Sequence, residues 1–100
     1  MDVFIFGKTG CARCESTKKK VSYLIDKWGV SERVGMSFVN LDTVEGLAEG
    51  SFHDVSQVPV TIVKRGHVEV ARWDGIVPAS DELRVSLEVR TIAAGGQGAA

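Results

Sequence analysis

The hydrophobic pattern along the chain alternates between segments typical of strands and segments with the periodicity of helices. The first two segments predict a strand and a helix. The run Val3–Phe6 is continuously apolar and is followed by Gly7, a pattern typical of a buried central strand. Between residues 12 and 28, apolar side chains recur with the i, i+3, i+4, i+7 spacing of an amphipathic helix, with Gly29 as its C-cap. The apolar positions of this helix are Val21, Leu24, Ile25 and Trp28.

The following segment predicts a second strand and a short helix. Met36–Leu41 is rich in apolar residues and reads as a strand. Asp42, with Glu45 three residues later, resembles a capping box and predicts a helix that continues to about Phe52. Two glycines inside this helix lower its intrinsic stability.

A hairpin and a last helix complete the pattern. Val60–Val63 is a β-branched run, Arg65-Gly66 predicts a turn, and His67–Trp73 returns as the second strand of a β-hairpin. Ser80 is expected to cap the last helix, whose first turn is acidic, as the positive end of the helix dipole favours. The apolar side of this helix consists of Leu83, Leu87, Val89 and Ile92.

Together these elements predict one α/β domain over residues 1–93, in the order βαβαββα. The first half alternates as a βαβ unit, so its strands are expected to be parallel, whereas the closing hairpin is antiparallel. We therefore expect a four-stranded mixed sheet with helices on both faces. Residues 94–100 form a glycine-rich tail that has no large side chains to bury, and we expect it to be disordered.

Composition and charge narrow the classes of function. The 100-residue chain carries a net charge of −1, which gives no overall attraction to nucleic acid or to anionic lipid. No apolar run approaches the roughly 20 residues of a membrane span, and the first residues do not form an export signal. We therefore expect a cytoplasmic protein that binds neither nucleic acid nor membranes. Structural disulfides are rare in the cytosol, so the two cysteines of this chain are expected to be catalytic or metal-binding.

The two cysteines lie where the first strand passes into the first helix. Cys11 ends the loop and Cys14 falls in the first helical turn, where unsatisfied N–H groups and the helix dipole stabilise a thiolate. Lys8 and Arg13 add positive charge, and together these effects favour a Cys11 pKa below the usual value of about 8.5. The two side chains are explained equally well by solubility, and we count both among the candidate substrate-binding residues. This placement predicts that Cys11 is the exposed nucleophile and that the more shielded Cys14 resolves the mixed disulfide.

Two other readings of the cysteine pair stay open. A C-x-x-C pair also occurs in zinc and iron–sulfur sites, but two cysteines cannot complete a four-ligand zinc site without further ligands such as His53 or His67. The chain could also be a redox-inactive interaction module.

The lysines at 18–20 are explained either as a solvated helix face or as a docking patch for an acidic partner near the cysteines.

Four segments of the sequence resemble the glutaredoxin branch of the thioredoxin-fold family, including its NrdH-type redoxins. They are "VFIFGKTGCARC", "QVPV", "WDGIVP" and "CARCESTKKK", and the resemblance covers residues 2 to about 90. It implies a thioredoxin-like fold in which Cys11 attacks and Cys14 resolves. It also implies that Pro59 is cis, whereas most X–Pro bonds are trans. In such proteins Val58 would offer its backbone to an extended substrate.

The resemblance also implies positions around the substrate. Lys8 matches a basic residue that helps to bind a glutathione carboxylate. Trp73 belongs either to the core or to the groove beside Pro59, and the resemblance favours the groove. Asp74 and Gly75 stand where glutathione-using relatives carry two glycines. The acidic side chain of Asp74 therefore argues against tight binding of glutathione.

The resemblance implies a monomeric thiol–disulfide oxidoreductase that needs no bound cofactor or metal and reduces a disulfide-containing protein substrate. Its reductant is expected to be thioredoxin reductase or glutathione, and ribonucleotide reductase is one candidate substrate. Two departures from the family limit the transfer of detail. Ala12-Arg13 separates the cysteines in place of Pro-Tyr or Val-Gln, and the stretch between the cysteines and Pro59 is longer than in NrdH-type redoxins.

Overall fold

The computed structural model describes residues 1–89, which form a four-stranded sheet and three helices in the predicted order. Residues 94–100 and Ile92, for which the sequence predicts a tail and a helix position, lie outside the described residues. Within residues 1–89, no helix is long and apolar enough to cross a membrane. The elements are β1 (Asp2–Gly7), α1 (Ala12–Lys27), β2 (Gly35–Asn40), α2 (Val44–Phe52), β3 (Val60–Arg65), β4 (Val68–Asp74) and α3 (Ser80–Ser86).

The four strands form one mixed sheet in the order β2-β1-β3-β4. β1 runs parallel to β2 and antiparallel to β3, and β3 and β4 form the antiparallel hairpin. The mixed sheet and both strand directions predicted from the sequence are therefore confirmed. In the β1–β3 register Phe6 is paired with Val60, so the last residues of β1 and the first residues of β3 lie at the same end of the sheet.

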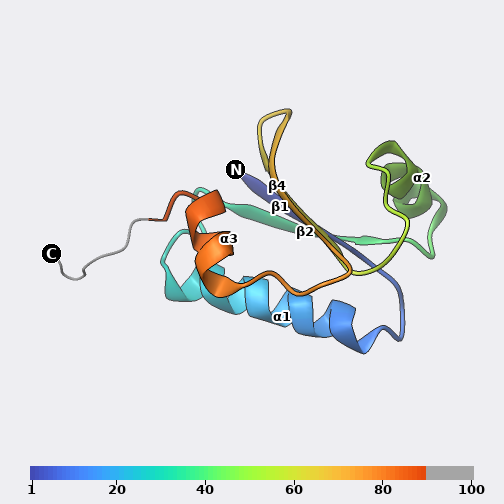
Figure 1. Cartoon of the computed structure of the whole chain (residues 1–100), viewed down its shortest axis with the longest axis horizontal. Coiled ribbons are helices and arrows are strands. Elements are labelled where there is room, and N and C mark those ends of the chain that lie inside the picture. Colours follow the sequence, from blue (N-terminus) through green and yellow to red (C-terminus); the bar gives the residue numbers. More distant parts are fainter. Residues whose placement is uncertain (90–100) are drawn as a thin grey trace, which may run out of the picture.

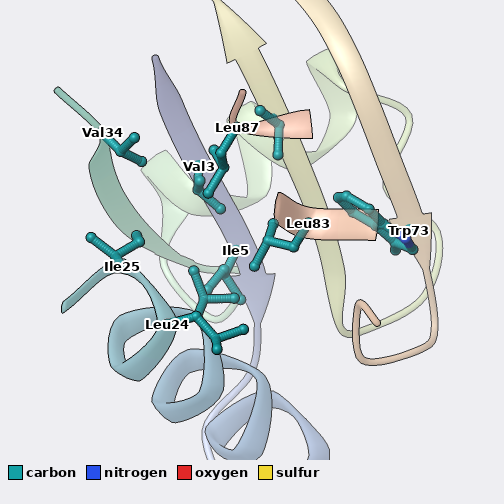
Figure 2. Close-up of a cluster of buried hydrophobic side chains, with 10 residues drawn as sticks. Val3, Ile5, Leu24, Ile25, Val34, Trp73, Leu83 and Leu87 are labelled. Carbon is teal, nitrogen blue, oxygen red and sulfur yellow. The ribbon is translucent and has the colours of Figure 1, made fainter. Parts of the chain in front are cut away.

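The larger core lies between one face of the sheet and helices α1 and α3 (Figure 1). Alternate residues of β1 point to this face, and Val3 and Ile5 pack there against Leu24, Ile25 and the α3 residue Leu83, as Figure 2 shows. The predicted apolar stripe of α1 is thus the stripe that is buried. The fully or nearly buried members of this core are Val3, Ile5, Val21, Leu24, Ile25, Val34, Val63, Trp73, Leu83 and Leu87.

Helix α2 covers part of the opposite face through its glycines. A Cβ atom on Gly46 would overlap the carbonyl oxygen of Asn40, and one on Gly50 would lie 2.7 Å from a Leu41 methyl carbon. These glycines therefore let α2 approach the end of β2 closely, in addition to lowering its helix propensity. The smaller core beneath this face contains Phe6, Val60 and Ile62.

The helix ends correct three capping predictions. The C-cap of α1 is Trp28, and Gly29, the predicted cap, follows it with a φ of 67°. The N–H groups of Gly29 and Val30 donate to carbonyls of the last helical turn. The predicted cap of α2 was Asp42, but the N-cap is Thr43, whose Oγ accepts the Gly46 N–H at 2.9 Å. Asp42 is unavailable for this role because its carboxylate accepts the Thr9 N–H instead, at 3.0 Å.

The prediction that Ser80 caps α3 is also wrong. α3 has Ala79 as its N-cap, with no side-chain capping bond, and Ser80 is the first residue of the helix. Ala79, which follows the buried Pro78, has the extended backbone of an N-cap, and Ser80 is already helical, so its side chain cannot occupy the cap position. The expected acidic first turn is present in Asp81 and Glu82.

Thr61 carries a buried hydroxyl that has no hydrogen-bond partner among residues 1–89. The side chain is fully buried in β3, opposite Ile5 of β1. An unpaired buried hydroxyl costs free energy because it has lost its bonds to water. We expect Thr61→Val, which keeps the side-chain shape, to raise the free energy of unfolding by about 1–2 kcal/mol in a urea titration. A loss of stability in this variant would contradict the assignment of Thr61 as unpaired.

Candidate active site

The residues of the predicted site lie at the end of the sheet where β1 ends and β3 begins. β1 leads through a short turn into Cys11, which is the N-cap of α1. The Val58–Pro59 segment immediately precedes Val60, which is paired with Phe6 of β1. The register of two adjacent antiparallel strands therefore brings the cysteine turn and the proline segment to one end of the molecule.

Two hydrogen bonds and one glycine conformation define the turn before Cys11. The Cys11 N–H donates to the Lys8 carbonyl at 3.3 Å, and the Thr9 N–H donates to Asp42. Gly10 has a φ of 80°, a conformation that side chains disfavour, so glycine is the natural residue at this position. These contacts fix the direction in which Cys11 enters the helix.

Cys11 and Cys14 form a disulfide, with 5.2 Å between their Cα atoms. The Cys14 N–H, one of the free donors of the helix start, lies 3.1 Å from the Cys11 sulfur. In the reduced protein this N–H and the helix dipole would stabilise a thiolate on Cys11. Cys11 is partly exposed and Cys14 is fully buried, as the predicted division into attacking and resolving thiols requires.

Gly7 is a residue of this site that the sequence reasoning missed. A Cβ atom at this position would lie 2.9 Å from the Cys14 Cβ, 3.0 Å from the Cys14 sulfur and 2.9 Å from the Phe38 ring. The missing side chain therefore leaves the space into which Cys14 packs against the end of β1. The position of Gly7, immediately after a buried strand and seven residues before Cys14, was the only signal available in the sequence.

The Val58–Pro59 peptide bond is cis, as the resemblance implied. The Pro59 ring is fully buried and shapes the surface from below. Val58 is half-buried, and within residues 1–89 neither its backbone N–H nor its C=O forms a hydrogen bond with the protein. These groups can therefore pair with an extended segment of another chain.

A shallow pocket of about 170 Å³ connects the proline segment with the cysteine turn. Lys8 and Val58 both line it, so two of the predicted substrate-binding residues belong to the same surface. The rest of its wall, which is mainly apolar, consists of Leu41, Leu47, Val55, Ser56 and Gln57.

Arg13 links the dithiol to a loop 62 residues away. Its guanidinium donates through Nη1 to the carbonyl of Gly75 at 3.1 Å, and the Gly75 N–H donates to the Pro59 carbonyl at 2.7 Å. The start of α1, the loop after β4 and the cis-proline segment are thus connected by consecutive hydrogen bonds. Lys20, which the sequence reasoning left as a helix-face residue, ties the same loop to α1 by donating to the Pro78 carbonyl at 2.8 Å.

The structure corrects the predicted position of Trp73. The side chain is only 8% exposed and packs in the core beside Leu83 (Figure 2). Its indole N–H donates to the Glu82 carboxylate at 2.9 Å. The cause is strand alternation: Trp73 pairs with Thr61, and both belong to the face that α1 and α3 cover.

Asp74 and Gly75 lie beside the site, but Asp74 has a partner of its own. The Arg72 Nε donates to both Asp74 carboxylate oxygens, at 3.0 and 3.2 Å. The guanidinium of Arg72 also donates to the carbonyls of His53 and Asp54. The negative charge next to Gly75 is therefore largely engaged by a neighbouring cation.

The histidines considered as metal ligands are not beside the cysteines. His53 lies against the Phe6 ring, and its ring nitrogens contact the Glu49 carbonyl and the Lys64 ammonium, at 2.9 and 3.2 Å. His67 lies in the turn between β3 and β4. In the described part of the chain no three His, Cys, Asp or Glu side chains gather into a metal-binding group. A metal on the cysteine pair would therefore need ligands from elsewhere.

Comparison with known proteins identifies the fold. No protein-family model and no curated protein matches the sequence. Thioredoxin 1 from Thermosipho africanus is similar in structure, with a TM-score of 0.70, 16% identity, and coverage of 88% of this chain and 91% of that one. Thioredoxin-2 of the malaria parasite has a TM-score of 0.71 at 23% identity, covering 87% of this chain and 80% of its own.

Thioredoxin O2 from Arabidopsis thaliana, solved in its oxidised state, has a TM-score of 0.70 at 23% identity, covering 87% of this chain and 71% of its own. At this level of identity the likeness establishes the fold. The cysteine pair, bonded at the start of the first helix, has a geometry that supports thiol–disulfide exchange as its general chemistry. The chain thus has the thioredoxin fold, with a C-x-x-C pair placed at the N-terminus of α1.

Proposed function

We propose that this protein is a thiol–disulfide oxidoreductase that reduces disulfides in other proteins. The observation that carries the proposal is the pairing of a partly exposed Cys11, at the N-cap of α1, with a fully buried Cys14. Such a pair allows a substrate to reach the Cys11 sulfur, while the Cys14 sulfur stays shielded from solvent within bonding distance of Cys11.

The proposed reaction transfers two electrons to the substrate in two exchanges. The Cys11 thiolate attacks one sulfur of the substrate disulfide, a mixed disulfide forms, and the other substrate sulfur leaves as a thiolate that takes up a proton. The Cys14 thiol loses its proton and attacks the Cys11 sulfur, which releases the second substrate thiol. The protein then carries the Cys11–Cys14 disulfide, which an external reductant must reduce by two electrons.

The free backbone groups of Val58 support an extended substrate at this site. A substrate segment that pairs with the Val58 N–H and C=O would lie beside the cysteine turn, because the Lys8–Val58 pocket connects the two. Pro59 would support this surface from beneath, and Arg13 and Gly75 would define its other side.

We place the protein in the glutaredoxin or NrdH-type branch, as a cytoplasmic monomer, with thioredoxin reductase as the preferred electron donor. The four matching sequence segments support this choice. Asp74 supports thioredoxin reductase over glutathione through the bulk of its side chain, which stands next to Gly75 where glutathione-using relatives carry a glycine, while Arg72 engages its charge. Ribonucleotide reductase is a candidate substrate.

The choice of reductant is open to a direct assay. We expect the oxidised protein to be reduced faster by NADPH and thioredoxin reductase than by NADPH, glutathione reductase and glutathione. NADPH consumption, followed at equal protein concentrations with an insulin-type disulfide substrate, measures both rates. The Asp74→Gly variant is the matched test of the reason given, since removal of the side chain should open space for glutathione and raise the glutathione-dependent rate. A wild-type protein that prefers glutathione would contradict the assignment.

A further inference from the structure

Two cationic side chains beside the dithiol have no carboxylate partner in the described part of the chain. Lys8 and Arg13 are both exposed, and neither takes part in an ion pair among residues 1–89. Most other charged groups around the site are engaged: Glu15 pairs with Lys18 at 3.5 Å, and Asp74 pairs with Arg72. Asp42 accepts the Thr9 N–H, which positions its carboxylate but leaves its negative charge in place. Lys8 and Arg13 therefore carry two positive charges beside Cys11 against the single unpaired carboxylate of Asp42.

Lys8 and Arg13 belong to opposite sides of the site. Lys8 lines the pocket formed with Leu47 of α2, on the face of the sheet that α2 covers. Arg13 is bonded to Gly75, in the loop that leads from β4 to α3 on the other face. Cys11 lies between these two residues in the sequence, as the N-cap of α1, and its N–H donates to the Lys8 carbonyl.

The Gly75 bond holds Arg13 in position before any substrate arrives. Among residues 1–89, Nη1 makes the single hydrogen bond of this guanidinium, so its other N–H groups can bind an anion. A guanidinium that is already fixed loses less conformational freedom when it binds a carboxylate than a free side chain does. Arg13 is therefore a preorganised hydrogen-bond donor, next to the disulfide, for a carboxylate of the substrate.

We propose that Lys8 and Arg13 select protein disulfides whose target cysteine has acidic side chains on both sides. The inference rests on the proposed function and adds the chemical class of its substrate. The apolar wall of the Lys8 pocket would receive an apolar side chain of the same extended segment, while the two cations bind the flanking carboxylates.

A set of disulfide peptides that differ only in flanking charge tests this preference. Peptides with Glu, Gln or Lys on both sides of the target cysteine are reduced by the protein, and kcat/KM is measured for each. Exposed charge pairs of this kind predict that the Glu peptide exceeds the Gln peptide by roughly 2- to 30-fold, with the Lys peptide slowest. The ratio should fall towards one at high salt, since the screening length shrinks from about 10 Å at 0.1 M to about 3 Å at 1 M.

The ratio of Glu to Gln peptide separates substrate selection from tuning of the thiol. A change in Cys11 reactivity alters both rates together and cancels in the ratio. Lys8→Gln and Arg13→Gln should each lower the ratio, and the double variant should bring it close to one. Arg13→Lys keeps the charge without the planar fork, so it should retain more of the preference than Arg13→Gln.

Lys27→Gln is the matched control, because it removes the same charge at the far end of α1, about 21 Å along the helix from Arg13. Its ratio should equal that of the wild type. A wild-type ratio of one, or an equal loss in Lys27→Gln, would overturn the inference and leave the proposed function standing. A failure to reduce any of the peptides, the neutral one included, would instead reject the proposed function, and the inference with it.

Discussion

Replacing Cys11 with serine is expected to lower disulfide reductase activity to the background of the uncatalysed reaction. A serine hydroxyl neither attacks a disulfide at neutral pH nor forms a mixed disulfide, and the buried Cys14 cannot take over because substrate does not reach it. An insulin-type reduction assay measures the loss. Retention of wild-type activity by this variant would show that the exchange does not begin at Cys11.

The serine variant also lacks the disulfide, so its fold needs a separate check. The proper reference is the reduced wild-type protein, which lacks the disulfide as well, and the two should unfold at similar urea concentrations. Ser16→Ala, which alters an exposed residue in the same part of α1, serves as the activity control and should behave like the wild type.

Replacing Gly7 with alanine is expected to affect both stability and activity. The new methyl group would lie 2.9 Å from the Cys14 Cβ and from the Phe38 ring, closer than such atoms pack. Overpacking of this kind in a buried position costs about 1–3 kcal/mol. The side chain of Cys14 must also shift, so the step in which Cys14 attacks the mixed disulfide should become slower.

Two measurements on the Gly7→Ala variant separate these effects. Urea unfolding gives the loss of stability, and single-turnover kinetics give the rate at which a preformed mixed disulfide is resolved. Gly35→Ala is the matched control, since its methyl group would approach only the end of the Asp2 side chain, which can move away. Unchanged unfolding and unchanged resolution in Gly7→Ala would show that the space beside Cys14 is not needed.

The elements of the fold follow from local patterns that the sequence displays openly. A continuous apolar run predicts a buried strand, and the i, i+3, i+4, i+7 spacing in α1 predicts the stripe that faces the core. Both patterns depend on neighbours in the sequence, so they could be read without the structure. The caps of α2 and α3 were misplaced by one residue because Asp42 and Ser80 are good capping residues in isolation. Only the tertiary bond from Thr9 shows why Asp42 is used elsewhere.

The site was predictable only in part, because several of its contacts join distant segments. The C-x-x-C pair and its place at a helix start were visible from the sequence. The space at Gly7 depends on Cys14 and Phe38, and the tether from Arg13 reaches Gly75 across 62 residues. The resemblance favoured the groove over the core for Trp73, and strand alternation could not correct this choice, because it defines two faces without saying which one the core covers.

The most direct test of the dithiol mechanism is a trapping experiment with Cys14→Ser. In this variant Cys11 can attack a substrate disulfide, but the second exchange cannot occur, so a covalent complex with the substrate should accumulate. Nonreducing electrophoresis and mass spectrometry of the reaction should show this complex, linked through Cys11 and released by dithiothreitol, and it should be absent from Cys11→Ser. Full turnover by Cys14→Ser without such a complex, or trapping through another residue, would contradict the account.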